Sequence, residues 1–390
     1  MNAPVSSYAA RYAPRRRYCD ADSHIMETFE WLGSYADPAL RERLPAMALG
    51  GAGKMAAKAI ALASARRSDA QATAELEKDV IASAKGWGAY GATDREERRQ
   101  ALDHLGFSRQ LVFSTFAGTQ FLRGEDLALK YGGARAHNRG MAEFCKGDPR
   151  LMAVASLPLD DPEQAIAEFE RARADGCGAF WIAAAPAGAM SPGHPALDPL
   201  WARLQEAKLP FVLHIGQGTR VLPKAYENNG RERGTDWLGG GENLRVLDYM
   251  VLPHAPEIFL SAMVFHGVFE RFPNLKGGVI ELGGGWVPAF LTRLDMAAKF
   301  FMKTDAQLKE LTLKPSEYIR RQVAFTPFPG EDVGALIRQA GPELFLFSSD
   351  FPHPEGSKDP IGKFEAVLKD FSEDVKTAFY SGNFERVFGT

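Results

Sequence analysis

Four side chains from distant parts of the chain are of the types that bind metal ions. Asp22 and His24 end one short apolar segment, and His214 and Asp350 end two others. Residues two apart on a strand point to the same side, so Asp22 and His24 could reach one ion together. Imidazole and carboxylate ligands in this mixture suit Zn²⁺, Mn²⁺ or Fe²⁺. The sequence therefore predicts a divalent metal site built from these four residues.

The surroundings of His214 and Asp350 strengthen this prediction. The segments that they end contain almost no other charged residue. A buried carboxylate without a partner costs several kcal/mol or changes its pKa, and one divalent cation satisfies several such groups at once. The alternative interpretation is a hydrogen-bonded polar cluster that holds no metal.

Three further residues could take part in the same chemistry. Glu281 ends another apolar segment and could bind a second metal, act as a general acid or base, or hydrogen-bond the ligands. Glu27 lies just beyond His24 and is a candidate further ligand. His353 follows Asp350 closely and has either a catalytic role or one in shaping its loop.

Candidates for substrate binding come from the following segments. His254 precedes a predicted helix, where it could touch a substrate. Trp286 and Arg293 follow Glu281 and could line a pocket for an aromatic acid, with helix packing and surface pairing as the alternatives. His266 falls about 15 Å along the predicted helix, at 1.5 Å per residue, which favours packing over metal binding.

These residues need a scaffold that gathers the ends of many strands. Eight apolar segments predict strands, and most are rich in Val, Phe, Ile or Leu, as strands buried on both faces should be; they cover 17–24, 109–116, 151–157, 178–183, 210–215, 275–282, 322–326 and 344–350. Helical patterns lie between them, with helices predicted over 162–175, 198–208 and 256–271. Eight parallel strand-helix units favour a (β/α)₈ TIM barrel, and an open doubly wound sheet is the alternative.

Two segments are too long for simple connections. Residues 33–103 predict a helical insertion after strand 1, and residues 217–248 form a polar, Gly-rich loop after strand 5. Long loops of this kind act as lids or binding segments, or else serve as oligomer contacts and surface decoration. We expect a single barrel domain over residues 1–390 that contains the 33–103 insertion.

Composition excludes several classes of function. The formal net charge is −3, so nucleic acid is not an expected partner. No run of 18 apolar residues occurs, so no membrane span is expected. The three cysteines are far apart, which favours a reducing, cytoplasmic location. The Arg-rich start could serve as a short transit segment, but an N-terminal arm is the expectation.

Four motifs together resemble one protein family. They lie in the family's order over nearly the whole chain, and they are residues 20–27 (DADSHIME), 209–216 (LPFVLHIG), 267–276 (GVFERFPNLK) and 346–356 (LFSSDFPHPEG). The chain is similar to the amidohydrolase-related family, in the branch of aminocarboxymuconate-semialdehyde decarboxylase and the hydroxybenzoate-type decarboxylases. The resemblance implies a barrel with one divalent metal, often Zn²⁺ or Mn²⁺, a small-molecule substrate and a homo-oligomer.

The resemblance also assigns roles to particular residues. It implies that Asp22 and His24 are the paired ligands of strand 1, that His214 is the strand-5 ligand, and that Asp350 is both ligand and proton-transfer group. Many relatives have a histidine where this chain has Glu281, so the role of that position is open. A glutamate adds negative charge there, which would serve an anionic transition state less well than an imidazole.

Three hypotheses about function follow from these observations. The first is a metal-dependent hydrolase or non-oxidative decarboxylase for a small carboxylate or carbonyl compound, with the metal as Lewis acid and Asp350 moving the proton. The second is a dinuclear iron or iron/manganese oxygenase, which the additional carboxylates suggest. The third is a non-catalytic paralogue with a structural role.

Overall fold

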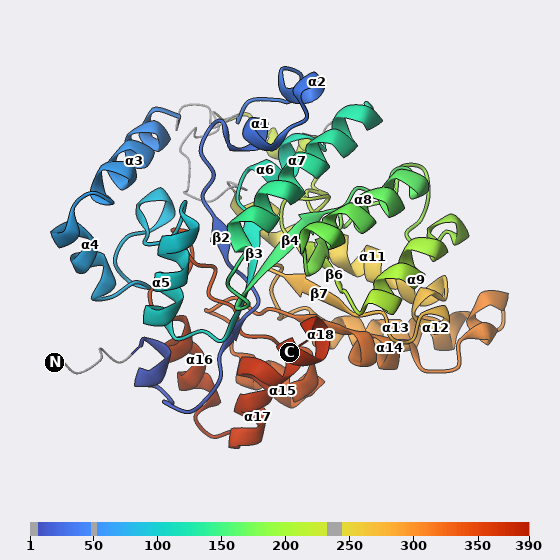
Figure 1. The fold of residues 1–390 in the computed structure, drawn as a ribbon. Coiled ribbons are helices and arrows are strands. Elements are labelled where there is room, and N and C mark those ends of the chain that lie inside the picture. Colours follow the sequence, from blue (N-terminus) through green and yellow to red (C-terminus); the bar gives the residue numbers. More distant parts are fainter. Residues whose placement is uncertain (1–6, 48–52, 123, 232–243, 390) are drawn as a thin grey trace.

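A computed structural model describes residues 7–47, 53–122, 124–231 and 244–389. Its centre is an eight-stranded, all-parallel sheet in the order β1-β3-β4-β5-β6-β7-β8, with β2 paired to β3 (Figure 1). The strands are β1 (Cys19–Asp20), β2 (His24–Ile25), β3 (Arg109–Ser114), β4 (Leu151–Ser156), β5 (Ala179–Trp181), β6 (Phe211–His214), β7 (Gly277–Ile280) and β8 (Val323–Phe325). Seven of the eight predicted segments thus contain strands.

The predicted strand 344–350 is extended but contains no regular strand. Its backbone nevertheless bonds to both edges of the sheet: Leu346 N donates to Phe325 O at 2.9 Å, and Ala21 N donates to Phe347 O at 3.0 Å. The predicted first strand is likewise divided into β1 and β2, with Asp350 N donating to the carbonyl of Asp22 between them at 3.0 Å. Residues 345–351 therefore lie between β8 and β1/β2 and join the two edges of the curled sheet.

Both faces of the strands are buried, as their composition predicts. Alternate side chains from the strands form one compact cluster, and its members include Leu111, Val154, Trp181, Val212, Ile280 and Ala324. The other face packs against the surrounding helices in a much larger cluster. The sheet is consequently a packed core, and polar side chains can gather only where strands end.

Helices surround the sheet (Figure 1). Those that follow strands β3 to β8 and the 345–351 segment are α6 (Ala117–Gln120), α7 (Leu127–Cys145), α8 (Pro162–Asp175), α9 (Asp198–Ala207), α10 (Val246–Val251), α11 (His254–Phe265), α12 (Val268–Arg271), α13 (Val287–Phe301), α14 (Pro315–Gln322), α15 (Val333–Ala340), α16 (Pro360–Leu368), α17 (Glu373–Thr377) and α18 (Asn383–Phe388). The predicted helices over 162–175 and 198–208 are confirmed as α8 and α9. Among the described residues, no helix is both long and apolar enough to cross a membrane.

The single helix predicted over 256–271 is wrong in one respect. It consists of α11 and α12, which are separated at His266 and Gly267. Gly267 has a φ of +70°, a left-handed conformation that glycine adopts at no steric cost and that ends α11. The glycine at this position is the sequence signal for the break.

The long segment between β2 and β3 is largely helical. It contains α1 (Trp31–Tyr35), α2 (Pro38–Arg41), α3 (Gly53–Arg66), α4 (Ala70–Glu77) and α5 (Arg95–Leu105). Asp69 and Asp94 cap α4 and α5 by accepting hydrogen bonds from backbone N–H groups of the first turn. Of the predicted loop 217–248, residues 232–243 lie outside the described residues.

Candidate metal centre

The ends of the strands bring six titratable side chains together. Their ligand atoms form two overlapping groups, within each of which all atoms lie within 4.8 Å of one another; the first is Asp22, His24, His214 and Glu281, and the second is His24, Glu281, Asp350 and His353. Three of the four residues predicted as ligands, Asp22, His24 and His214, fall into the first group, and Asp350 falls into the second, which shares His24 with the first. Glu281 and His353, which were predicted as catalytic residues, lie in the same cluster.

Short contacts connect the members of this cluster. His24 Nε2 lies 3.2 Å from Asp22 Oδ1 and 3.6 Å from Asp350 Oδ1. His214 Nε2 lies 3.4 Å from Asp22 Oδ1 and 3.3 Å from Glu281 Oε2. Both imidazoles are fully buried, so water cannot satisfy them. Nitrogen and oxygen atoms thus converge on one small volume.

The hydrogen bonds around the cluster leave its inner atoms available to a cation. His214 Nδ1 is 2.9 Å from the carbonyl of Ile215, so Nδ1 donates a proton and Nε2 keeps its lone pair in the neutral ring. His24 Nε2 is buried and makes no hydrogen bond within the described chain. Buried polar atoms in this state are costly, and a divalent cation would satisfy them. The donor set therefore fits a metal ion.

Backbone conformation sets the direction of two of the carboxylates. Glu281 and Asp350 have φ values of +54° and +53°, in the left-handed region that residues with a Cβ seldom adopt. Lys208 is the remaining residue of this kind in the described chain, and it ends α9. Strained backbone persists where neighbouring contacts enforce it, and it gathers at functional sites. Here it turns both carboxylates out of the strand direction and into the cluster.

Electrostatics favour ionised Asp22 and neutral His24. Burial acts to raise the pKa of Asp22, but the interactions of its carboxylate with the imidazoles of His214 and His24 outweigh burial and hold that pKa well below its usual range. Burial, together with the charge of His353, lowers the pKa of His24 to about 4. A neutral imidazole beside an ionised carboxylate is the protonation state that metal ligation requires.

His353 is held by two partners on opposite sides of its ring. Thr115 donates its hydroxyl proton to Ile25 O at 2.6 Å, so at 2.9 Å it accepts from His353 Nε2. Nδ1 then carries the lone pair of the neutral ring, and it lies 2.8 Å from Asp350 Oδ1. Two acceptors this close need a proton or a cation between them. The Asp350–His353 pair is therefore placed to share one of the two.

Glu27 contributes no atom to either ligand group, and its role as a metal ligand stays a prediction. Its carboxylate accepts hydrogen bonds from the backbone N–H groups of Thr115 at 3.1 Å, Phe116 at 3.2 Å and Ala117 at 2.9 Å. Burial raises its pKa, and these three N–H groups oppose that rise. Glu27 thus anchors the turn after β3, which carries Thr115.

The residues predicted to bind substrate lie away from the cluster. Arg293 is exposed and pairs with Glu257 at 2.8 Å, and His254 is exposed at the start of α11. Trp286 donates its indole N–H to the carbonyls of Leu282 and Gly283, where it caps the turn before α13. The contacts described for Arg293 and Trp286 are surface pairing and helix packing, and a part of the three residues in substrate binding stays a prediction.

His266 also has a packing role, as expected from its place in the sequence. It follows the last residue of α11, and its Nδ1 lies 2.8 Å from the hydroxyl of Ser191. The ring therefore joins α11 to the loop before α9 and contributes no atom to either ligand group.

Sequence reasoning missed a buried arginine beneath the cluster. Arg98 of α5 donates to the backbone carbonyl of His24, to Gly91 O at 2.8 Å and to Gln110 Oε1 at 3.1 Å. Gln110 in turn donates to Asp20 Oδ2 at 2.8 Å. The guanidinium therefore fixes the strand that carries His24 to the helices between β2 and β3. An arginine on a helix rich in charged residues gives no sequence signal for this role.

A cavity opens above the cluster. It has a volume of about 200 Å³, and its lining includes the ligand candidates Asp22, Glu281 and Asp350. The apolar part of the wall comes from Ile215, Leu244, Tyr249, Phe328 and two prolines. We call this cavity the metal lobe. A small organic molecule placed in it would contact both the carboxylates and an apolar wall.

Comparison with curated proteins finds decarboxylases. The chain is 25% identical over 253 residues to 2-amino-3-carboxymuconate-6-semialdehyde decarboxylase of Dictyostelium discoideum, which covers 63% of each chain. It is 26% identical over 235 residues to γ-resorcylate decarboxylase of Rhodococcus jostii, which covers 56% of this chain and 66% of that protein. The matches thus span slightly less than two thirds of the length of these two relatives.

Comparison with solved structures shows the fold. An amidohydrolase of Mycobacterium avium subsp. paratuberculosis superposes with a TM-score of 0.75 and 23% identity, over 96% of this chain and 100% of that one. A dihydroxybenzoic acid decarboxylase of a Polaromonas species, solved with manganese and the inhibitor 2-nitroresorcinol, superposes with a TM-score of 0.61 and 17% identity over 96% and 97%. At these identities the likeness establishes the arrangement of the chain.

The family itself is shown by the match along the sequence. A model of the amidohydrolase family matches residues 19–390, from β1 to the end of the chain. This range includes every member of the two ligand groups. The chain therefore belongs to the amidohydrolase family.

Proposed function

We propose that this protein is a metal-dependent enzyme that removes CO₂ from a small organic acid without oxidation. The observation that carries the proposal is the buried cluster of imidazoles and carboxylates at the strand ends, where His24 Nε2 has no hydrogen-bond partner within the described chain. Asp22, His24, His214 and Asp350 would hold one divalent ion, Zn²⁺, Mn²⁺ or Fe²⁺, with Glu281 beside them. The bound ion would act as a Lewis acid toward an oxygen of the substrate.

The protein's own side chains supply the proton for this reaction. When the bond to the departing carboxylate breaks, its electron pair stays on the substrate carbon, which must then gain a proton. Asp350 Oδ1 and His353 Nδ1 lie 2.8 Å apart, Asp350 lines the metal lobe, and in the proposed reaction this pair carries the proton. Thr115 fixes the ring so that Nδ1 faces Asp350. This pair is the proton donor that we infer.

Two features favour decarboxylation over hydrolysis. The curated relatives that match this chain are decarboxylases of organic acids. In addition, the wall of the metal lobe is largely apolar, with Tyr249, Phe328 and two prolines facing the carboxylates. An apolar wall destabilises a charged carboxylate more than it destabilises neutral CO₂, and it keeps water from the carbon that gains the proton.

The test combines metal analysis with a carboxylate-loss assay. Mass spectrometry should find about one divalent ion per purified chain, and 2,6-dihydroxybenzoate and 5-carboxyvanillate are the first substrates to assay for CO₂ release. Asp350→Asn should abolish release from any substrate that turns over, with an unchanged circular dichroism spectrum. Asp374→Asn, an exposed aspartate on α17, is the matched control. Full activity of Asp350→Asn, or purified protein that binds no metal, would refute the proposal.

One observation favours the dinuclear alternative, so the experiments must distinguish one bound ion from two. The two ligand groups overlap and share His24 and Glu281, so six side chains surround a volume that two ions could occupy. An oxygenase would contain about two ions per chain and consume O₂ with its substrate. A single ion and no oxygen consumption would exclude it.

The remaining features of the chain are proposed on the same basis. We propose one closed barrel domain over residues 1–390, in which the helices within 33–103 are an insertion after strand 1 and residues 217–248 border the mouth. We further propose a cytoplasmic homo-oligomer that acts on a small molecule and needs neither nucleic acid nor membrane. Light scattering of the purified protein tests the oligomer.

A further inference from the structure

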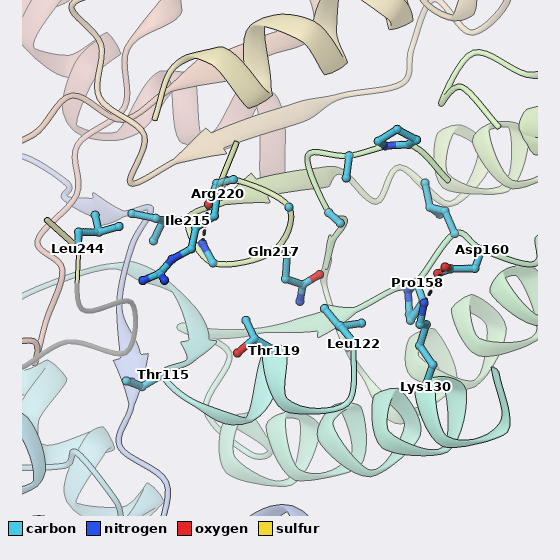
Figure 2. Close-up of a pocket in the computed structure, with 17 residues that line it drawn as sticks. Thr115, Thr119, Leu122, Lys130, Pro158, Asp160, Ile215, Gln217, Arg220 and Leu244 are labelled. Carbon is cyan, nitrogen blue, oxygen red and sulfur yellow. Dashed lines mark hydrogen bonds and ion pairs between the residues drawn. The ribbon is translucent and has the colours of Figure 1, made fainter. Parts of the chain in front are cut away.

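A second cavity, larger than the metal lobe, adjoins it at the mouth of the sheet. It has a volume of about 460 Å³ and is lined by the segments that follow β3, β4, β5 and β6 (Figure 2). Ile215 and Leu244 line both cavities, so the two are neighbours. We call this cavity the polar lobe. The chemistry proposed above uses the metal lobe and leaves the polar lobe without a role.

The far end of the polar lobe holds a buried lysine. Figure 2 shows Lys130 and Asp160 together at one end of the cavity, whereas Ile215, Leu244 and Arg220 lie at the other end. Lys130 is 8% exposed, and its Nζ donates to Asp160 Oδ1 at 2.6 Å. An ammonium has three N–H donors, and Asp160 uses one of them. A second acceptor placed in the cavity could therefore bind Lys130.

Charge separates the two lobes. Asp22, Glu281, Asp350 and Glu355 line the metal lobe, and none of its described lining residues is Lys or Arg. Among the described residues, the charged groups that line the polar lobe are Lys130, Arg220 and Asp160. A second anion on a substrate is repelled from the first lobe and attracted to the other.

The wall between the two ends can also orient a polar molecule. Gln217 is 2% exposed, and its Nε2 donates to Gly118 O and to Ser156 Oγ, both at 2.9 Å. These two bonds fix the amide, which borders the cavity between Arg220 and Lys130 (Figure 2). The polar lobe thus has a fixed polar wall and a cation at its far end.

From these observations we propose that the polar lobe binds a second anionic group at the far end of an elongated organic acid. The inference rests on the proposed function for the position of the reacting carboxylate at the metal lobe. Small-molecule sites usually have volumes of about 300–1,000 Å³. The metal lobe falls below that range and the polar lobe lies within it. A substrate that fills both lobes is longer than a single-ring acid and carries a carboxylate at each end.

The test measures how a second carboxylate changes binding. Octanedioate and octanoate have chains of the same length and differ in the far end alone. Isothermal titration of each into the metal-loaded protein gives the ratio of the two dissociation constants. We expect octanedioate to bind the unmodified protein at least fivefold more tightly, with the preference falling as salt screens the charges.

Two substitutions should move this ratio in opposite directions. Lys130→Gln should bring it close to one, because the cation at the far end is gone. Asp160→Asn should raise it two- to threefold, because Lys130 then has no competing carboxylate. Disruption of the fold would lower binding of both acids in both variants, so opposite shifts distinguish recognition from structure. Arg95→Gln, an exposed arginine that pairs with Glu143 outside both lobes, should leave the ratio unchanged.

Equal dissociation constants for the two acids in the unmodified protein would overturn the inference, as would a ratio unchanged by Lys130→Gln. These outcomes are separate from failure of the proposed function. Protein that binds metal and releases CO₂ from a single-ring acid, with a ratio near one, refutes the polar lobe alone. A retained ratio in protein that holds no metal refutes the proposed reaction and leaves the anion site in place.

Discussion

Replacement of Glu281 by glutamine tests whether its negative charge holds the metal. Glu281 Oε2 belongs to both ligand groups, so a cation bound within either group lies within about 4.8 Å of it. A divalent cation and a unit negative charge 4 Å apart attract by about 8 kcal/mol at an effective dielectric constant of 20. The substitution also removes the repulsion between Glu281 and the carboxylates of Asp22 and Asp350, which offsets part of the lost attraction. We therefore expect Glu281→Gln to weaken binding by about 3 kcal/mol, roughly a hundredfold.

Competition between the protein and a colorimetric chelator for Mn²⁺ measures this change. Glu310→Gln, at an exposed glutamate outside both ligand groups, is the control. An affinity for Mn²⁺ within threefold of the unmodified protein would refute the reasoning and leave Glu281 as a hydrogen-bonding or acid–base residue. Loss of one of two ions per chain would instead identify Glu281 as a ligand of a second metal.

Three further substitutions test the support of the site. Arg98→Met should lower the free energy of unfolding by about 3 kcal/mol in urea titrations, because three buried carbonyl acceptors lose a charged donor; a loss below 1 kcal/mol contradicts this role. Burial lowers the pKa of His137 to about 4, so the unfolded chain takes up the proton first and stability is lost as pH falls from about 6.5 toward 4. Between pH 7 and 5, the free energy of unfolding of His137→Gln should therefore fall by about 2 kcal/mol less than that of the unmodified protein. Equal decreases in the two proteins would contradict burial of His137 as a cause of the pH dependence. Thr115→Val should reduce kcat at least tenfold with metal content unchanged, because His353 loses the acceptor that fixes its ring; an unchanged kcat would show that the Asp350–His353 pair works without it.

The strands and the ligand candidates could be predicted from the sequence because both depend on local pattern. A run of apolar residues indicates a buried strand. A single carboxylate or imidazole at its end, as at His214 and Asp350, indicates a polar site where the strand stops. Parallel strands end at one face, so strand ends far apart in sequence meet in space. His24 and Glu281 could be placed near one another on this argument alone, and the structure brings them together.

Some side-chain contacts could not be predicted because local pattern does not encode them. Glu27 lies three residues beyond His24, yet its carboxylate turns to the backbone after β3, about 90 residues further along the chain. Arg293 follows Glu281 closely, but the direction of its helix face points it to solvent and to Glu257. Arg98 reaches the cluster from α5, through a tertiary contact that only the packed structure defines. Nearness in sequence to a strand end therefore predicts position without predicting direction.

At two of the ligand candidates, Glu281 and Asp350, an unfavourable backbone conformation sets the direction of the side chain. For a residue with a Cβ, the left-handed conformation costs about 1–2 kcal/mol, and glycine would relieve that cost at Glu281 and Asp350. Hydrogen bonds from Glu281 N to Thr326 Oγ1 at 2.8 Å and from Asp350 N to Asp22 O at 3.0 Å hold the strained turns in place. Glycine has no carboxylate to offer the cluster. A chain that keeps an acidic residue at both positions therefore retains strain that folding alone would remove, and this conflict supports ligation as the role of both carboxylates.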